Sequence, residues 1–174
     1  DPLHVVTIVN AILFGLIIYF GGLLTFRSLP SFHTLAFIAS LTMLASIPLF
    51  TVATMAWSEP LFIVFTLLGI LSANRYIEKQ GVPQLLLFSL AVALSAMTRY
   101  VGVAIIGWGA VVVFMFCRGG FGKKSAHTGL FAILPVLSLG LWLLRNIAFA
   151  GEPFGPRASS SYSLSQNLMF MFDH

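Results

Sequence analysis

Charged residues are scarce in this chain. Asp, Glu, Lys and Arg together make up 8% of its 174 residues, whereas 59% are hydrophobic. A soluble domain carries about 25% charged residues, which cover its water-facing surface. The chain therefore lacks the polar faces that a soluble protein with a large core requires, and we expect an integral membrane protein.

Cysteine is nearly absent. Cys117 is the only one, so no disulfide can form within the chain and no cysteine-based metal site is possible. The histidines are far apart and none belongs to an HExxH pattern: His4, His33, His127 and His174. No cofactor and no metal site is identifiable, and the sequence neither supports nor excludes a divalent metal ion.

The chain also lacks a basic face or arm, although its calculated pI is 9.7. The nine Lys and Arg residues occur singly or in pairs between apolar runs. Nucleic-acid-binding proteins instead cluster such residues on one surface. We expect no nucleic-acid partner, and the basic residues serve as indicators of membrane topology.

What the sequence does contain is long apolar segments. About 20 apolar residues in a helix cross a bilayer, and the pattern predicts an all-α, polytopic membrane protein with about six transmembrane helices. In the second span, Ala36 and Ser40 have the four-residue spacing that lets helices approach closely in lipid, and Pro48 predicts a kink. The predicted spans cover about residues 5–26, 34–54, 60–74, 82–97, 101–117 and 128–144.

The segment from Val82 to Cys117 contains one charge, Arg99. A single helix of that length would measure about 54 Å, whereas the hydrocarbon core of a bilayer is about 30 Å thick. We therefore expect a hairpin with its bend near Thr98 to Tyr100. The alternative places Arg99 within a helix and the bend elsewhere.

The connections between spans are expected to be polar. Residues 75–81 read as a polar loop, and residues 118–124 as a flexible basic one that fails the phosphate-loop pattern. We expect residues 1–150 to form the membrane domain. Residues 151–174 would be an extracytoplasmic loop or the start of an interfacial helix near 164–172.

With six spans, the loops alternate between the two sides of the membrane. One side receives six basic residues: Arg27, Arg75, Lys79, Arg118, Lys123 and Lys124. The other side receives Arg99, Arg145 and Arg157. The richer side is cytoplasmic by the positive-inside rule, so Glu59, Arg99, Arg145 and Arg157 are expected to share the extracytoplasmic face.

Glu59 is the most isolated acidic residue. It stands between two long uncharged, apolar segments, with Arg27 the last Lys, Arg, Asp or Glu before it and Arg75 the first after it. An ionisable side chain in this position lies at a membrane surface or is held inside the membrane for a function. Pro60 suits the first turn of a helix, and Ser58 or Glu59 could cap that helix.

Together these residues suggest phosphate and sugar chemistry. Arginines grip a phosphate through paired, charge-assisted hydrogen bonds, and a nearby carboxylate can orient a sugar hydroxyl or act as a base. Structural roles compete with this interpretation. Glu59 could cap a helix or pair with Arg99, Arg145 could be an interfacial anchor, and Arg157 could be a solvated loop charge. Tyr100 could belong to an interfacial aromatic belt.

Three short motifs carry a resemblance. SEPLF at 58–62, LSAMTRYVG at 94–102 and WLLRN at 142–146 occur in this order, with Gly151 and Gly155 following. They resemble the multi-spanning glycosyltransferases of the GT-C fold, which include the bacterial protein O-mannosyltransferase and aminoarabinose-transferase-like enzymes. The similarity covers roughly residues 1–157.

The resemblance implies transfer from a polyprenyl-phosphate-linked sugar to a lipid, glycan or protein acceptor. It also implies a prokaryotic cytoplasmic membrane with an extracytoplasmic active face. The family's catalytic Asp lies in a large first external loop, so we expect residues 1–174 to be an internal piece with that Asp upstream. The implied substrate-binding residues are Glu59, Arg99, Tyr100, Arg145, Asn146 and Arg157.

Two other function classes stay open. A transporter or flippase of a lipid-linked or anionic solute would place charge near mid-bilayer, often on broken helices within repeated halves. In this sequence the charges are expected to cluster at one face, and no repeat is visible. A non-catalytic membrane subunit is the third possibility. Sugar, acceptor and oligomeric state are not specified by the sequence.

Overall fold

The computed structural model describes residues 2–55, 58–152 and 169. Within these residues all regular secondary structure is helical, with seven helices and no strand. The prediction of an all-α protein is thus confirmed. The helices are α1 (Pro2–Ser28), α2 (His33–Leu44), α3 (Ile47–Thr54), α4 (Glu59–Lys79), α5 (Val82–Thr98), α6 (Gly102–Phe116) and α7 (Phe121–Ala150).

The chain divides into two compact units, Asp1–Leu139 and Gly140–His174. The first unit holds α1 to α6 and the first part of α7, and it contains the core. The second unit holds the last residues of α7. There the guanidinium carbon of Arg145 lies 5.9 Å from the ring centroid of Phe149.

Helix α1 packs against α2 at small residues. A Cβ atom built on Gly22 would collide with the hydroxyl of Ser40 and lie 3.6 Å from the carbonyl oxygen of Ala36. The close approach predicted from the spacing of Ala36 and Ser40 is therefore confirmed. The glycine on α1 supplies the space on the other side of the contact.

The second predicted span is broken. Helices α2 and α3 meet at a bend of 54°, Pro48 lies in the first turn of α3, and Ser46 accepts a hydrogen bond from the backbone N–H of Leu49. The chain then returns along α1, since the side-chain amide of Asn10 donates a 2.7 Å hydrogen bond to the carbonyl oxygen of Met55. The predicted kink near Pro48 is confirmed.

Helix α4 differs from the prediction at its end. The expected polar loop from Arg75 onward is helical up to Lys79. Tyr76 explains the continuation, because its ring is fully buried and its hydroxyl lies 2.8 Å from Nδ1 of His127. The helix stops at Gln80, which adopts the left-handed conformation (φ 54°, ψ 22°).

Gln80 also links two helix ends. Its side-chain amide donates to the carbonyl oxygens of Tyr76, Ile77 and Phe116, and its side-chain oxygen accepts from the backbone N–H of Arg118. The last carbonyl groups of a helix have no partner within the helix. One side chain therefore bonds such carbonyls at the end of both α4 and α6.

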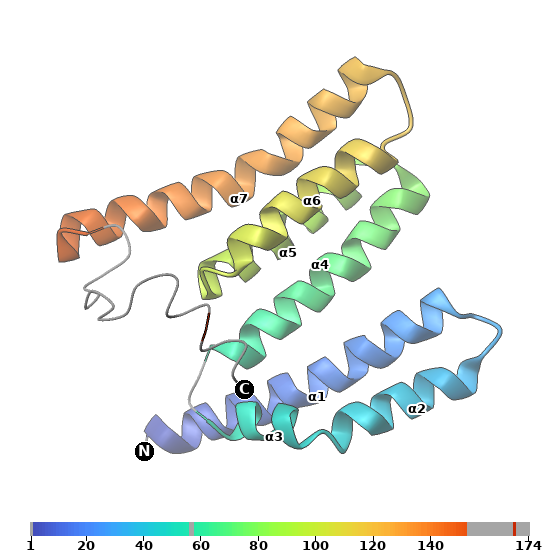
Figure 1. Cartoon of the computed structure of the whole chain (residues 1–174), viewed down its shortest axis with the longest axis vertical. Helices are drawn as coiled ribbons and strands as arrows, with labels where there is room; N and C mark the ends of the chain where they lie inside the picture. Colours follow the sequence, from blue (N-terminus) through green and yellow to red (C-terminus); the bar gives the residue numbers. More distant parts are fainter. Residues whose placement is uncertain (1, 56–57, 153–168, 170–174) are drawn as a thin grey trace. The chain divides into compact units, whose positions relative to one another are not determined.

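The core of the first unit lies among α4, α5, α6 and the start of α7 (Figure 1). Its fully buried aromatic centre is Phe88 with Phe131, whose ring centroids are 4.8 Å apart. Gly109 lets Phe131 approach α6, because a Cβ atom there would overlap the ring. Helix α7 begins at Phe121, so Lys123 and Lys124 lie in a helix and not in the flexible loop expected there.

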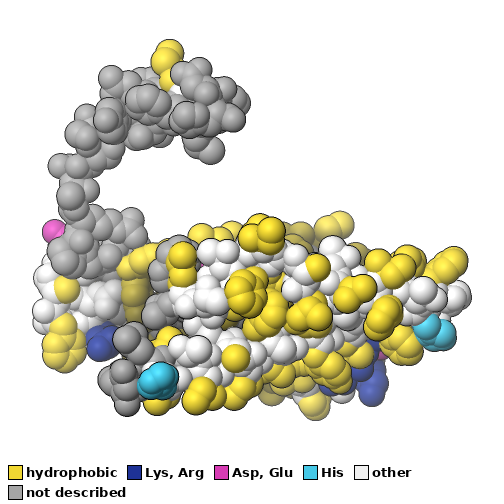
Figure 2. Space-filling view, turned by 90° about the horizontal axis from the view of Figure 1, so that it is seen from below, with side chains coloured by type: hydrophobic (Ala, Val, Ile, Leu, Met, Phe, Trp, Pro, Cys, Tyr) yellow, Lys and Arg dark blue, Asp and Glu magenta, His cyan; other side chains and the backbone are white. Residues whose placement is uncertain are grey.

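Three helices are long and apolar enough to cross a membrane: α1, α4 and α7. The bent pair α2 and α3 would make a fourth if it is one span, and α5 and α6 are shorter apolar helices. On the visible face in Figure 2, hydrophobic side chains are abundant and charged side chains are few. This distribution is typical of a membrane-embedded protein.

Candidate functional site

Glu59 and Arg99 form the centre of the candidate site. Glu59 is the first residue of α4, and Arg99 is the C-cap residue that directly follows α5. Nη1 of Arg99 donates a hydrogen bond to Oε1 of Glu59 and the two side chains form an ion pair. Residues that are 40 positions apart in the sequence are thus in direct contact.

The turn that carries Arg99 is the predicted hairpin bend. Helix α5 ends at Thr98 and α6 begins at Gly102, so Arg99 lies between helices and not within one. Its carbonyl oxygen accepts a 2.9 Å hydrogen bond from the N–H of Gly102, and its backbone is extended. The hairpin prediction is confirmed over the alternative of a bend elsewhere.

Gly102 makes this tight turn possible. A Cβ atom at this position would lie 2.8 Å from the backbone nitrogen of Ala96 and 2.9 Å from the carbonyl oxygen of Ser95. Both are backbone atoms, which cannot rotate away. The glycine of the TRYVG motif is therefore explained by the close approach of α6 to the last turn of α5.

Ser95 fastens the same turn to α4. Its fully buried hydroxyl lies 3.0 Å from Oγ1 of Thr66, and its carbonyl oxygen accepts a 2.7 Å hydrogen bond from the Thr98 hydroxyl. These contacts hold the Arg99 turn in place against the helix that starts with Glu59.

The ion pair is only partly buried. The Arg99 side chain is 39% exposed and that of Glu59 is 23% exposed. A guanidinium carries five N–H donors, and one carboxylate does not use all of them. Arg99 therefore has donors to spare when it is paired with Glu59. An anionic oxygen arriving from outside can therefore share Arg99 with Glu59.

Ser58 occupies the capping position of α4, but its side chain makes no capping hydrogen bond. Pro60 lies in the first turn, as the sequence predicts, and it is buried. Of the two capping alternatives, Ser58 therefore lies at the N-cap without a side-chain hydrogen bond, and Glu59 is the acidic residue in the first turn, at the positive end of the helix.

The other predicted site residues lie in three places. Tyr100 follows Arg99 in the turn and is 39% exposed. Arg145 and Asn146 lie on the last part of α7, in the second unit. Arg157 lies outside the described residues, as do Trp57 and most of the segment at 164–172.

The sequence did not reveal a second polar region at the opposite end of the first unit. There Arg27 of α1 and Arg75 of α4, both assigned to the cytoplasmic side in the predicted topology, line the same cavity. Each lies near the C-terminal end of its helix. This shared position at helix ends was the one sequence signal that the two arginines could meet. The sequence could not show that α1 and α4 pack side by side.

No protein-family model matches the chain, and comparisons with curated proteins and with solved structures find no match either. The contacts of Glu59 and Arg99 and the membrane character of the helices are therefore the features that bear on function.

Proposed function

We propose that this chain is the membrane part of a glycosyltransferase that moves a sugar from a polyprenyl-phosphate carrier to an acceptor on the extracytoplasmic face. The observation that carries the proposal is the contact between Glu59 and Arg99. A partly exposed arginine sits in a turn between two apolar helices and is oriented by a carboxylate. The ordered motifs that resemble the GT-C family add to this argument.

The proposed architecture is GT-C-like with six spans, the bent pair α2 and α3 counting as one. Its support comes from the alternation of helix ends in the first unit. The C-terminal ends of α1, α4 and α6 lie at one end in Figure 1, and the N-terminus of α4 lies at the other. Basic residues outnumber acidic ones at the first end, as expected for a cytoplasmic side.

The proposed reaction is a direct displacement at the anomeric carbon. An acceptor hydroxyl attacks that carbon, its proton passes to a base, and the bond to the carrier's phosphate oxygen breaks. The electron pair of this bond leaves with the polyprenyl phosphate. Arg99 would stabilise the departing phosphate charge, Glu59 would order the pocket or bind a sugar hydroxyl, and the base is not assigned to a residue of this chain.

A transporter or flippase of a lipid-linked solute is the second candidate. The observation that favours it is the 54° break between α2 and α3, since broken helices are common at transport sites. Against it stands the position of Glu59 and Arg99 at helix ends and not at mid-helix.

The test uses the protein encoded by the complete gene, purified into nanodiscs and supplied with a radiolabelled polyprenyl-phosphate sugar. We expect release of polyprenyl phosphate, and a decrease of about 100-fold for Arg99→Ala, comparable with the loss of one transition-state donor. Arg118→Ala is the matched control, because Arg118 is an exposed arginine in a different loop, after α6.

The outcomes separate the candidates. Equal turnover for Arg99→Ala and wild type, with unchanged donor affinity, would disprove the phosphate role. When the same protein is reconstituted into sealed vesicles, movement of label across the membrane without release of polyprenyl phosphate would favour the flippase.

A further inference from the structure

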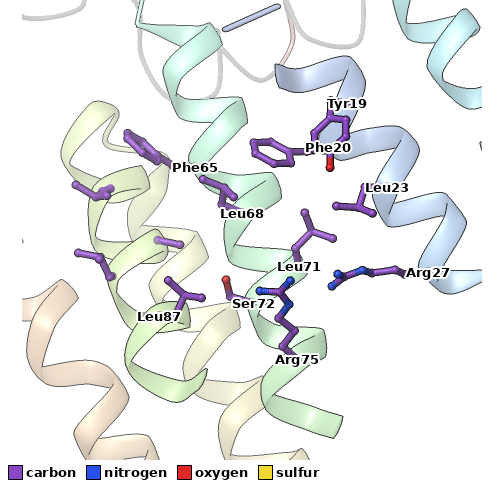
Figure 3. A pocket seen from close by; sticks show the side chains of 13 residues that line it. Tyr19, Phe20, Leu23, Arg27, Phe65, Leu68, Leu71, Ser72, Arg75 and Leu87 are labelled. Atoms are coloured by element: carbon purple, nitrogen blue, oxygen red, sulfur yellow. The ribbon is translucent and has the colours of Figure 1, made fainter. Parts of the chain in front are cut away.

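A cavity of about 360 Å³ lies among α1, α4 and α5 of the first unit (Figure 3). Its wall is mostly apolar. The lining includes Phe20, Leu23, Phe65, Leu68, Leu71 and Leu87.

A second cavity of about 590 Å³ adjoins the first, since Arg27, Arg75 and Leu87 line both. Its other lining residues are mostly polar and include Glu78, Lys79 and Gln84. The two cavities together form one groove that is apolar along the helices and polar at its mouth. We call it the α1/α4 groove.

The mouth of the α1/α4 groove carries excess positive charge. Arg27 and Arg75 reach into the same opening from α1 and from α4 (Figure 3). Neither makes an ion pair with another described residue. The lining of the second cavity contains one acidic residue, Glu78, and three basic ones, Arg27, Arg75 and Lys79. Two like charges that share an opening repel one another, and a bound anion would relieve this repulsion.

We propose that the α1/α4 groove binds an anionic phospholipid. Its phosphate would lie between the guanidinium groups of Arg27 and Arg75, and one acyl chain would fill the apolar part. Arginine is suited to this task because its planar donors match phosphate oxygens in pairs. Basic pockets between transmembrane helices on the cytoplasmic side are known to take such head groups.

The length of the groove fits a chain and not a free ion. Tyr19 and Arg27 both line it, and eight residues of helix span about 12 Å. Phe65 and Arg75 line it on α4 over about 15 Å. A free phosphate would occupy only the mouth and would leave this apolar wall uncovered.

The charge also predicts selectivity. Lys79 lies in the lining beside the arginines, so the positive choline of a zwitterionic lipid would be repelled, whereas the neutral glycerol of phosphatidylglycerol would not. The proposal requires α1 and α4 to lie in a membrane, and it does not depend on glycosyl transfer.

The test is native mass spectrometry of the protein released from nanodiscs of equal phosphatidylglycerol and phosphatidylcholine. We expect retained phosphatidylglycerol in wild type and about tenfold weaker retention in the double variant Arg27→Gln/Arg75→Gln, since hydrogen bonds to charged groups are lost. Arg118→Gln is the matched control, an exposed arginine that does not line either cavity.

A second variant tests the acyl chain and does not require removal of charge. Leu87 is 46% exposed and lines both cavities, so Leu87→Trp should fill the groove. We expect it to lose phosphatidylglycerol but to keep any binding of inorganic phosphate.

Equal retention of the two lipids in wild type would overturn the proposal. So would unchanged lipid binding in Leu87→Trp, or displacement of the lipid by inorganic phosphate at equal concentration, because either would indicate a site for the anion alone. Preferential retention of added polyprenyl phosphate over phosphatidylglycerol would overturn the choice of a phospholipid.

Discussion

The buried hydroxyl of Ser89 on α5 donates a 2.6 Å hydrogen bond to the backbone carbonyl oxygen of Phe131 on α7. Pro135 explains why this carbonyl is available. In a helix, the N–H of residue 135 would bond the carbonyl of residue 131, and proline has no N–H. Ser89 thus replaces the hydrogen bond that Pro135 removes from α7.

Ser89→Ala should lower the free energy of unfolding by about 1–3 kcal/mol, because it leaves a buried carbonyl without a partner. The measurement is reversible unfolding in mixed micelles, followed by the loss of helical circular dichroism. Ser89→Ala in a Pro135→Ala background is the control, since alanine 135 restores the N–H, and there the loss should be below about 0.5 kcal/mol. Equal losses in both backgrounds would contradict this account.

Gly102→Ala should destabilise the protein by about 1–3 kcal/mol through overpacking. The new Cβ atom would meet backbone atoms of Ala96 and Ser95. Gly107→Ala on the same helix is the control, because nothing lies within 4 Å of its added Cβ. There alanine should be neutral or should stabilise by up to about 1 kcal/mol. An unchanged free energy of unfolding in Gly102→Ala would contradict this prediction and would show that the turn shifts to make room for the added Cβ atom.

The path of α2 and α3 can be tested with single cysteines in a Cys117→Ala background. We expect an impermeant maleimide to label Ser31→Cys and Ser58→Cys from opposite sides of a vesicle. The hydrogen bond from Asn10 to Met55 supports this expectation, because it brings the end of α3 back to the first third of α1. Lys79→Cys should label from the Ser31 side. Labelling of positions 31 and 58 from one side would make α2 and α3 a re-entrant pair and the six-span proposal wrong.

The ion pair between Glu59 and Arg99 should contribute little to stability. Both side chains are partly exposed, and exposed pairs contribute about 0–1 kcal/mol. A double-mutant cycle with Glu59→Gln and Arg99→Gln should give a coupling energy in that range, decreasing with added salt. A coupling above about 3 kcal/mol would indicate a structural pair and would weaken the proposed role of Arg99 in binding phosphate.

The sequence predicted the parts of the fold that depend on chain length and on single residues. An apolar segment too long for one span, with Arg99 near its middle, led to the α5–α6 hairpin. Pro60 and Pro48 marked a helix start and a break. These features are local, because a bilayer of known thickness and the missing N–H of proline constrain them directly.

Other parts depend on distant contacts and could not be read from the sequence. The polar residues after Arg75 suggested a loop, but Tyr76 is buried against α7 and keeps the helix intact. Because helical hydrogen bonds join residues four apart, Pro135 leaves the carbonyl of Phe131 without a partner in the helix. Nothing in the sequence identifies Ser89 as the residue that bonds it. For the same reason the sequence did not predict the α1/α4 groove, because Arg27 and Arg75 are far apart in the chain and only the packing of α1 against α4 brings them to one opening.

The hydrogen bonds of Gln80 have a consequence for hydrophobic mismatch. Helix α6 has 15 residues and measures about 22 Å, several ångströms less than the thickness of a typical hydrocarbon core. A short helix usually thins the bilayer around it so that its last polar groups reach water. Because Gln80 already bonds the carbonyl oxygen of Phe116, α6 could end below the head groups in the proposed six-span arrangement with less local thinning of the membrane.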